Sequence, residues 1–283
     1  MSSSTIPATA PAPVVEKDTT IEIAGHEALR ARIYGRKRAG GGAPLVLHFH
    51  GGAFTSGDLD SGACMARLLA QVEAVVVSVA YPLAPEHRFP DAVEAGYAAL
   101  EWTYKHRNKL VGANARIYLA GDEAGGNLAA AVAMVARDRG HPPLAGQVLV
   151  APMLDPCVGT PSLRESVAGD THCKWADGWQ QYLRGPMDAE HPYAVPGRAT
   201  RLTALPPALI LSAADDPMRD EAIAYAHRLQ AAGIDVTSGV IPQQTGWPDA
   251  LAEPTNGCPC EVAVLAHLRA FFNAATPPTP PPV

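Results

Sequence analysis

The sequence of 283 residues lacks any long run of basic residues. Lys and Arg together number 22, against 28 Asp and Glu, which gives a formal net charge of -6 at pH 7. A chain with this balance is not expected to bind nucleic acid or an anionic membrane surface as its main partner. The composition instead favours a small molecule as the substrate or ligand.

The first residues also lack the pattern of a targeting segment. Residues 1–18 have no charged start followed by an apolar run, so we expect neither a signal peptide nor a membrane span, and we expect a cytoplasmic protein. This segment and residues 276–283 are rich in proline. We expect both to be flexible, with no function of their own.

The cysteines lack the spacing of a zinc site and the density of a disulfide-rich secreted domain. We predict free thiols. Cys258 and Cys260, which have one residue between them, are the one close pair and give a weak metal or redox signal. The prediction is therefore a site with no metal and no organic cofactor. The five cysteines are Cys64, Cys157, Cys173, Cys258 and Cys260.

Short Val-rich apolar runs alternate with segments of helical periodicity along the chain. Such runs are typical of strands buried on both faces, and their alternation with helices predicts an α/β fold with a mainly parallel central sheet. We expect one domain over residues 19–275, with a cap-like excursion over about 155–202. The expected strands are 20–23, 31–34, 44–49, 74–79, 116–121, 145–152, 207–213 and 236–241, and the expected helices are 63–72, 90–105, 126–140, 219–233 and 260–275.

Four motifs occur in a fixed order: "HFHGGAF" from His48, "SVAYPLAPEHRFPDA" from Ser78, "GDEAGGNLAAAVA" from Gly121 and "DDPMRDEAIAYAHRL" from Asp215. Together they resemble the hormone-sensitive-lipase branch of the α/β-hydrolase esterases, over nearly the whole of residues 19–275. The resemblance implies the α/β-hydrolase fold, here with a reduced cap. It also implies a site built from a serine, a histidine, an aspartate and an oxyanion hole.

The resemblance carries over residue by residue, and two positions depart from it. Gly51, Gly52 and Ala124 match the oxyanion hole, and the orienting aspartate falls on Asp216. Glu123, however, occupies the position of the serine. Gly246 occupies the position of the histidine in the segment "IPQQTGWP".

Hydrolysis by a serine needs a hydroxyl activated by an adjacent base, and neither group is at its expected position. Our main interpretation is therefore a non-hydrolytic enzyme in which Glu123 is a general acid/base, with Asp216 beside it and an oxyanion hole for a carbonyl-containing metabolite. Isomerase, lyase, dehydratase or cyclase chemistry, as in specialised biosynthesis, would fit. Two alternatives stay open: a catalytically dead ligand-binding pseudoenzyme, and a residual carboxylesterase.

Four further residues are candidates for binding the substrate. Phe54 and Trp247 lie beside the site in their motifs, while His172 and Trp175 lie in the cap-like excursion, where His172 is also the best substitute for the missing base. The alternative for all four is ordinary packing or surface exposure. Pairing of edge strands between subunits would allow a homodimer.

Overall fold

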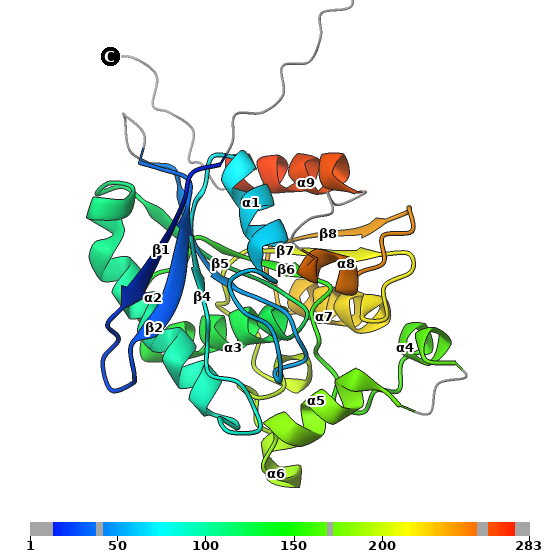
Figure 1. The fold of residues 1–283 in the computed structure, drawn as a ribbon. Coiled ribbons are helices and arrows are strands. Elements are labelled where there is room, and N and C mark those ends of the chain that lie inside the picture. The colour runs from blue at the N-terminus through cyan, green and yellow to red at the C-terminus, as the bar shows by residue number, and fades with distance from the viewer. Residues whose placement is uncertain (1–13, 38–41, 169–171, 254–259, 275–283) are drawn as a thin grey trace, which may run out of the picture.

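The structure is a computed structural model that describes residues 14–37, 42–168, 172–253 and 260–274. Its centre is one eight-stranded sheet in the order β1-β2-β4-β3-β5-β6-β7-β8 (Figure 1). β2 is antiparallel to both β1 and β4, and the other neighbours are parallel. The strands are β1 (Glu16–Ile21), β2 (Leu29–Tyr34), β3 (Pro44–Phe49), β4 (Val75–Val79), β5 (Arg116–Asp122), β6 (Gly146–Val150), β7 (Ala208–Ala213) and β8 (Val236–Ile241).

Helices cover both faces of this sheet (Figure 1). α1 packs against α9 on one face, and α2 packs against α3 on the other. The remaining helices are short, apart from α7, which packs on β7 and β8. The helices are α1 (Ala63–Gln71), α2 (Asp91–Leu110), α3 (Ala124–Arg139), α4 (Pro161–Ser166), α5 (Lys174–Tyr182), α6 (Pro186–Ala189), α7 (Arg219–Ala231), α8 (Asp249–Ala252) and α9 (Glu261–Ala274), with a 3-10 helix η1 (Pro196–Arg198).

The core lies between the central strands and the helices. Every residue of β3, β4, β6 and β7 is buried, which is the expected consequence of helices on both faces. α3 is buried from Ala124 to Ala136, because it is enclosed between β5, β6 and α2. Its alanine-rich sequence permits this close approach. The predicted α/β-hydrolase architecture, with a mainly parallel sheet, is thus confirmed.

Some boundaries differ from the predictions. β1 begins at Glu16, so residues 16–18 are part of the sheet and not of a flexible segment. They pair with β2, and the Asp18 carboxylate accepts a hydrogen bond from Nε of Arg32 at 2.5 Å. Residues 1–13 and 275–283 lie outside the described residues. Cys64, Cys157 and Cys173 are free, as predicted, whereas Cys260 is disulfide-bonded, so the prediction of a free thiol is wrong there.

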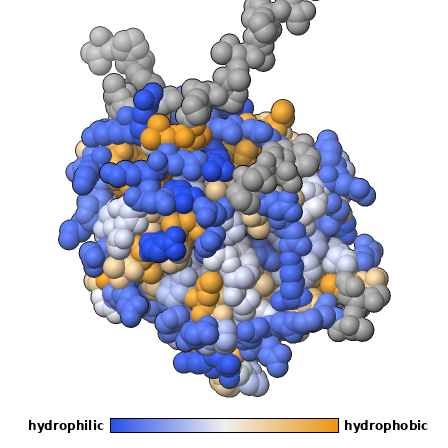
Figure 2. Space-filling view, in the orientation of Figure 1, coloured by the Kyte–Doolittle hydropathy of each residue, from blue (hydrophilic) through white to orange (hydrophobic). Residues whose placement is uncertain are grey.

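The segment between β6 and β7 contains α4, α5, α6 and η1. Of these, α4, α5 and α6 gather at one end of the molecule (Figure 1). Hydrophilic residues cover most of the face drawn in Figure 2, and the apolar ones lie in small separate groups. Among the described residues, no helix has both the length and the apolar character needed to cross a membrane.

Candidate active site

Glu123 lies in the turn that joins β5 to α3. Its backbone has φ 51° and ψ -117°, a conformation that residues other than glycine rarely adopt and that clusters at functional sites. Three backbone hydrogen bonds hold it: its N–H donates to the carbonyl of Val150 at 3.0 Å, and its carbonyl accepts from the N–H of Met153 at 3.0 Å and from that of Asn127 at 3.2 Å. The turn therefore projects a side chain that is only 4% exposed from a rigid, strained position.

The glycines of this turn are required by close backbone approaches. A Cβ atom on Gly125 would lie 2.1 Å from the carbonyl oxygen of Phe49, and one on Gly121 would lie 2.1 Å from the carbonyl oxygen of Gly125. Both obstacles are backbone atoms that cannot rotate away. The sequence "GDEAGGN" is thus matched to a turn that sits directly against the end of β3.

Both oxygen atoms of the Glu123 carboxylate are hydrogen-bonded. Oε2 accepts from the backbone N–H of Gly52 and from that of Ala53, the latter at 3.0 Å. Oε1 accepts from Nε1 of Trp175 at 2.6 Å, which ties the turn to α5 in the cap-like excursion. The carboxylate therefore accepts hydrogen bonds from both backbone donors in the loop that follows β3.

The predicted oxyanion-hole residues are only partly arranged as expected. The N–H of Gly51 donates to Oδ2 of Asp122 at 3.0 Å, so it is directed away from Glu123. Asp122 is held in turn by Nε2 of the buried His48, at 3.2 Å. Ala53, which follows the two glycines, supplies the second donor instead of Gly51, and only the position after "HGG" could have signalled it. Ala124 begins α3 directly after Glu123 and is fully buried.

Burial controls the electrostatics of the site. Desolvation raises the pKa of Glu123 above its ordinary value, although the hydrogen bonds from Gly52 and Ala53 and the charge of Lys174 oppose the rise. Burial also raises the pKa of Asp216, to about 7, and the charges of Asp215 and Glu123 add to this effect. Two acids with raised pKa values thus repel each other within one site.

Asp216 follows β7 and is 1% exposed. Its Oδ1 atom accepts a hydrogen bond from the N–H of Met218 at 2.8 Å, and its Oδ2 atom has no partner among the described residues. Gly246 lies in the loop after β8, where its N–H donates to Oδ2 of Asp215 at 2.8 Å. Because β7 and β8 are parallel neighbours, these two loops leave the sheet side by side.

The predicted aromatic residues are buried around this site. The Phe54 ring is stacked on Tyr182 with ring centroids 3.9 Å apart, and Trp247 is 2% exposed. His172 does not belong to this group. Its side chain is 76% exposed and lies 2.8 Å from the carboxylate of Asp177, so the structure places it on the surface of the excursion, against the expectation that it lines the site.

Two features of the site were missed from the sequence. Lys174, at the start of α5, forms an ion pair with Asp249 of α8 and so joins the excursion to the loop that carries Gly246. Glu221 is buried in α7, where it accepts a hydrogen bond from the N–H of Leu154 at 3.0 Å. Burial raises the pKa of Glu221 well above its ordinary value. Lys174 stands in none of the four motifs, and Glu221 lies in the motif that begins at Asp215, where only Asp216 was singled out.

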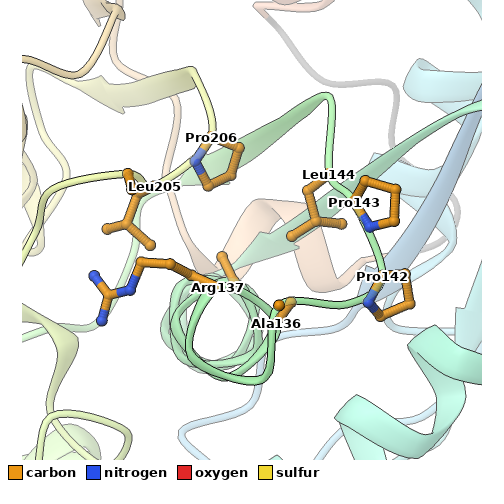
Figure 3. A pocket seen from close by; sticks show the side chains of 10 residues that line it. Ala136, Arg137, Pro142, Pro143, Leu144, Leu205 and Pro206 are labelled. Atoms are coloured by element: carbon orange, nitrogen blue, oxygen red, sulfur yellow. The ribbon is translucent and has the colours of Figure 1, made fainter.

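A cavity of about 450 Å³ lies at the C-terminal end of α3, the end away from Glu123 (Figure 3). It is lined by Arg137, Leu205 and a group of prolines, and the Arg137 guanidinium already bonds Asp138 and the carbonyl of Arg201. At a rise of about 1.5 Å per helical residue, the cavity is roughly 20 Å from Glu123. Within the described ranges, no group of three His, Cys, Asp or Glu residues is placed to hold a metal ion.

Comparison with known proteins places the chain in a family. The model of the Abhydrolase_3 family, described as alpha/beta hydrolase fold, matches residues 46–246. The esterase LipI of Mycobacterium tuberculosis is 43% identical over 69% of this chain and 62% of its own length. The gibberellin receptor GID1B of Arabidopsis thaliana is 34% identical over 71% of this chain and 59% of its own length.

Solved structures agree with this placement. The carboxylesterase EstE1, cloned from a metagenomic library, superposes with a TM-score of 0.81 at 35% identity, over 94% of this chain and 91% of its own. Because such relatives are esterases, our main interpretation of non-hydrolytic isomerase, lyase, dehydratase or cyclase chemistry is wrong, and the esterase alternative is favoured. The chain belongs to the hormone-sensitive-lipase-like family of α/β hydrolases.

Proposed function

We propose that the protein binds small carboxylic esters beside Glu123 and hydrolyses them slowly, as a residual carboxylesterase. One observation carries this proposal: the N–H groups of Gly52 and Ala53 converge on a single oxygen atom next to the strained turn. Two converging donors are what the negatively charged oxygen of an ester-hydrolysis intermediate needs. The similarity to the esterase LipI and to the carboxylesterase EstE1 supports the same activity.

The proposal includes two substitutions relative to the family pattern. Glu123 takes the position of the nucleophilic serine, which its strained turn between β5 and α3 supports. Gly246 takes the position of the histidine, in a loop tied to Asp215 beside Asp216. The usual pair of hydroxyl and imidazole is then missing, and a different route to hydrolysis is needed.

In the proposed route, the Glu123 carboxylate activates a water molecule. Its raised pKa makes it a stronger base than an exposed glutamate. The water oxygen bonds to the ester carbonyl carbon as its proton passes to Glu123, and the bond to the alcohol oxygen then breaks as that oxygen takes up the proton. The carbonyl oxygen has to displace Oε2 from Gly52 and Ala53, so we expect turnover at least about 10⁴-fold below that of a complete triad.

A second candidate function is ligand binding without turnover. The same contacts favour it, because the Glu123 carboxylate already accepts from the N–H groups of Gly52 and Ala53 and competes with any ester carbonyl for these two donors. The similarity to the gibberellin receptor GID1B supports a binding role for this scaffold. In this case the cap-like excursion would hold the ligand while Glu123 keeps the site inactive.

Hydrolysis of p-nitrophenyl acetate and butyrate tests the two candidates. We expect slow turnover by the wild type, loss of it in Glu123→Ala, and a gain in the double variant Glu123→Ser with Gly246→His. Glu86→Ala, which removes an exposed glutamate from the loop before α2, is the matched control and should keep wild-type turnover. No turnover by the wild type together with a gain in the double variant would favour the binding role. Equal turnover by the wild type and Glu123→Ala would show that the Glu123 carboxylate takes no part in the hydrolysis.

A further inference from the structure

Three buried side chains form a hydrogen-bonded chain across the neighbouring strands β4, β3 and β5. His48 of β3 lies opposite Ser78 of β4 in the strand register, and its Nδ1 atom is 3.0 Å from the hydroxyl oxygen of Ser78. Its Nε2 atom is 3.2 Å from Oδ1 of Asp122, the last residue of β5. A neutral His48 with its proton on Nε2 satisfies both partners, because Nε2 then donates to the carboxylate and Nδ1 accepts from the hydroxyl.

Serine, histidine and aspartate are also the residue types of a hydrolytic triad, but this chain of side chains is closed to substrates. Ser78 and His48 are 0% exposed, and Asp122 is 2% exposed. The backbone at Gly62 packs against the imidazole, since a Cβ atom there would lie 3.3 Å from Cε1 of His48. An ester carbonyl therefore has no access to the Ser78 hydroxyl, and any role of these residues in hydrolysis is indirect.

The chain of side chains ends on the loop that follows β3. The second carboxylate oxygen of Asp122, Oδ2, accepts from the N–H of Gly51 at 3.0 Å. The carbonyl of the same peptide group, which is that of His50, accepts from the hydroxyl of Tyr81 at 2.9 Å. Because a peptide group is planar, hydrogen bonds at both of its polar ends fix its orientation.

The orientation of this peptide group determines where the next two N–H groups point. Gly52 and Ala53 follow it directly, and both donate to Oε2 of Glu123. Gly52 has φ 113°, a region that is open to glycine and in which it is not held by a side chain of its own. The loop therefore needs a restraint from outside its own sequence, and the bond from Gly51 to the buried carboxylate provides one.

We propose that His48 is a positioning residue for the two oxyanion donors. Its imidazole keeps the Asp122 carboxylate turned toward the N–H of Gly51, and the peptide group fixed in this way directs the next two N–H groups, those of Gly52 and Ala53, at one point. This inference rests on the proposed function and deepens it, since it adds a residue that acts from inside the sheet without touching the ester. Preorganised donors act mainly on the transition state, so loss of the restraint should lower kcat more than it changes KM.

Amide hydrogen exchange, measured by NMR, tests the positioning without any need for turnover. In His48→Leu the carboxylate loses its donor, and we expect the exchange protection of the Gly52 and Ala53 amides to fall roughly tenfold or more. His48→Gln keeps an N–H donor on a flexible side chain and should restore most of the protection. Gln147→Leu is the matched control, because it also replaces a fully buried polar residue of the sheet, near the start of β6, and should leave both amides unchanged.

Esterase kinetics give a second readout. With p-nitrophenyl acetate we expect His48→Leu to lower kcat roughly tenfold or more, with KM changed less than about threefold, and His48→Gln to recover most of kcat. If the wild type does not hydrolyse the ester, the proposed function fails, and the exchange result still decides whether His48 positions the donors. Thermal denaturation confirms that each variant is folded. If His48→Leu is not, Ser78→Ala, which removes only the hydroxyl next to Nδ1, takes its place with the same expected loss of protection.

Wild-type protection of Gly52 and Ala53 in the folded His48→Leu variant would overturn the proposal. A loss of protection that is equal at amides throughout the sheet would overturn it as well, because it would reflect general destabilisation. The same conclusion would follow from equal losses in His48→Leu and His48→Gln, or from an unchanged kcat of His48→Leu where the wild type hydrolyses the ester.

Discussion

The Oε2 atom of Glu123 lies 3.0 Å from the backbone nitrogen of Ala53, and the N–H of Gly52 donates to the same atom. The donors arranged for a negatively charged oxygen are thus occupied by an oxygen of the protein itself. This occupancy is stabilised from the other side by Nε1 of Trp175, which holds Oε1 at 2.6 Å. A ligand that uses these donors therefore competes with an internal carboxylate, and the properties of that carboxylate can be tested separately.

The turn at Glu123 depends on the absence of a side chain at Gly125. We expect Gly125→Ala to lower the free energy of unfolding by about 2–4 kcal/mol, because its Cβ would lie 2.1 Å from the backbone oxygen of Phe49. Urea denaturation measures the change. Gly185→Ala is the control, since a Cβ at Gly185 meets nothing within 4 Å, and it should cost well under about 1 kcal/mol. Equal losses in the two variants would contradict the proposed clash.

The raised pKa of Asp216 predicts a specific dependence of stability on pH. Its pKa is about 7 in the folded protein and 3.8 in the reference state, so the folded protein binds more protons than the unfolded chain between these values. The free energy of unfolding therefore falls as the pH rises from 4 to 7 and is fully reduced above 7. A difference of about three pH units corresponds to at most about 4 kcal/mol.

Urea denaturation between pH 4 and pH 8 measures this effect. Asp216→Asn cannot ionise, so its stability relative to the wild type should increase with pH and level off above pH 7. Asp235→Asn, at an exposed position, should follow the wild-type curve. A constant difference between Asp216→Asn and the wild type across this range would mean that the carboxyl titrates normally in the fold.

The sequence predicted the central elements because their patterns are strong and local. β3 and β8 have the predicted boundaries, since a buried apolar run and a run enclosed by turn residues define them clearly. The start of β1 at Glu16 was missed, because its strand character comes from pairing with β2 and not from its polar sequence. The end of α2 was missed as well: the helix continues to Leu110 and not to residue 105, because the charged residues of its last turn show no apolar periodicity.

The site was predictable only where a motif fixed it. The position of Glu123 in the turn and the role of Gly52 as a donor follow from "GDEAGGN" and "HGG". The diversion of Gly51 to Asp122 could not be predicted, because it depends on where a side chain from β5 points. The bond from Trp175 joins residues 52 positions apart, and no local pattern in the excursion encodes it. Contacts between residues far apart in the sequence thus decide whether the N–H donors of the site are available. These contacts could not be predicted from the sequence.

Trp175 should stabilise the ionised form of Glu123. In Trp175→Phe the Oε1 atom loses its donor, so we expect the pKa of Glu123 to rise further and the free energy of unfolding to fall by about 1–3 kcal/mol at pH 7. The loss should be smaller at pH 5 than at pH 7, because a larger share of Glu123 is protonated at the lower pH and protonation removes the charge that needs the donor. Trp179→Phe removes a similar volume from a ring that packs on Phe54, and its effect should not depend on pH in this range. Thermal and urea denaturation of both variants at the two pH values provides the comparison.

Removal of the Glu123 carboxylate should expose the donors to an external anion. In Glu123→Ala the N–H groups of Gly52 and Ala53 and the indole N–H of Trp175 lose their common acceptor, and a cavity of carboxylate size remains among them. Acetate has the same charged group and should bind there, with a dissociation constant on the order of millimolar and a rise in Tm that increases with acetate concentration. The wild type, whose own carboxylate fills the cavity, should show neither effect. Glu123→Gln is the informative control, because its amide oxygen can still accept from the backbone donors and should keep acetate out. If Glu123→Ala binds no acetate above the level of Glu123→Gln, the donors collapse when the side chain is removed and are not preorganised for an oxyanion.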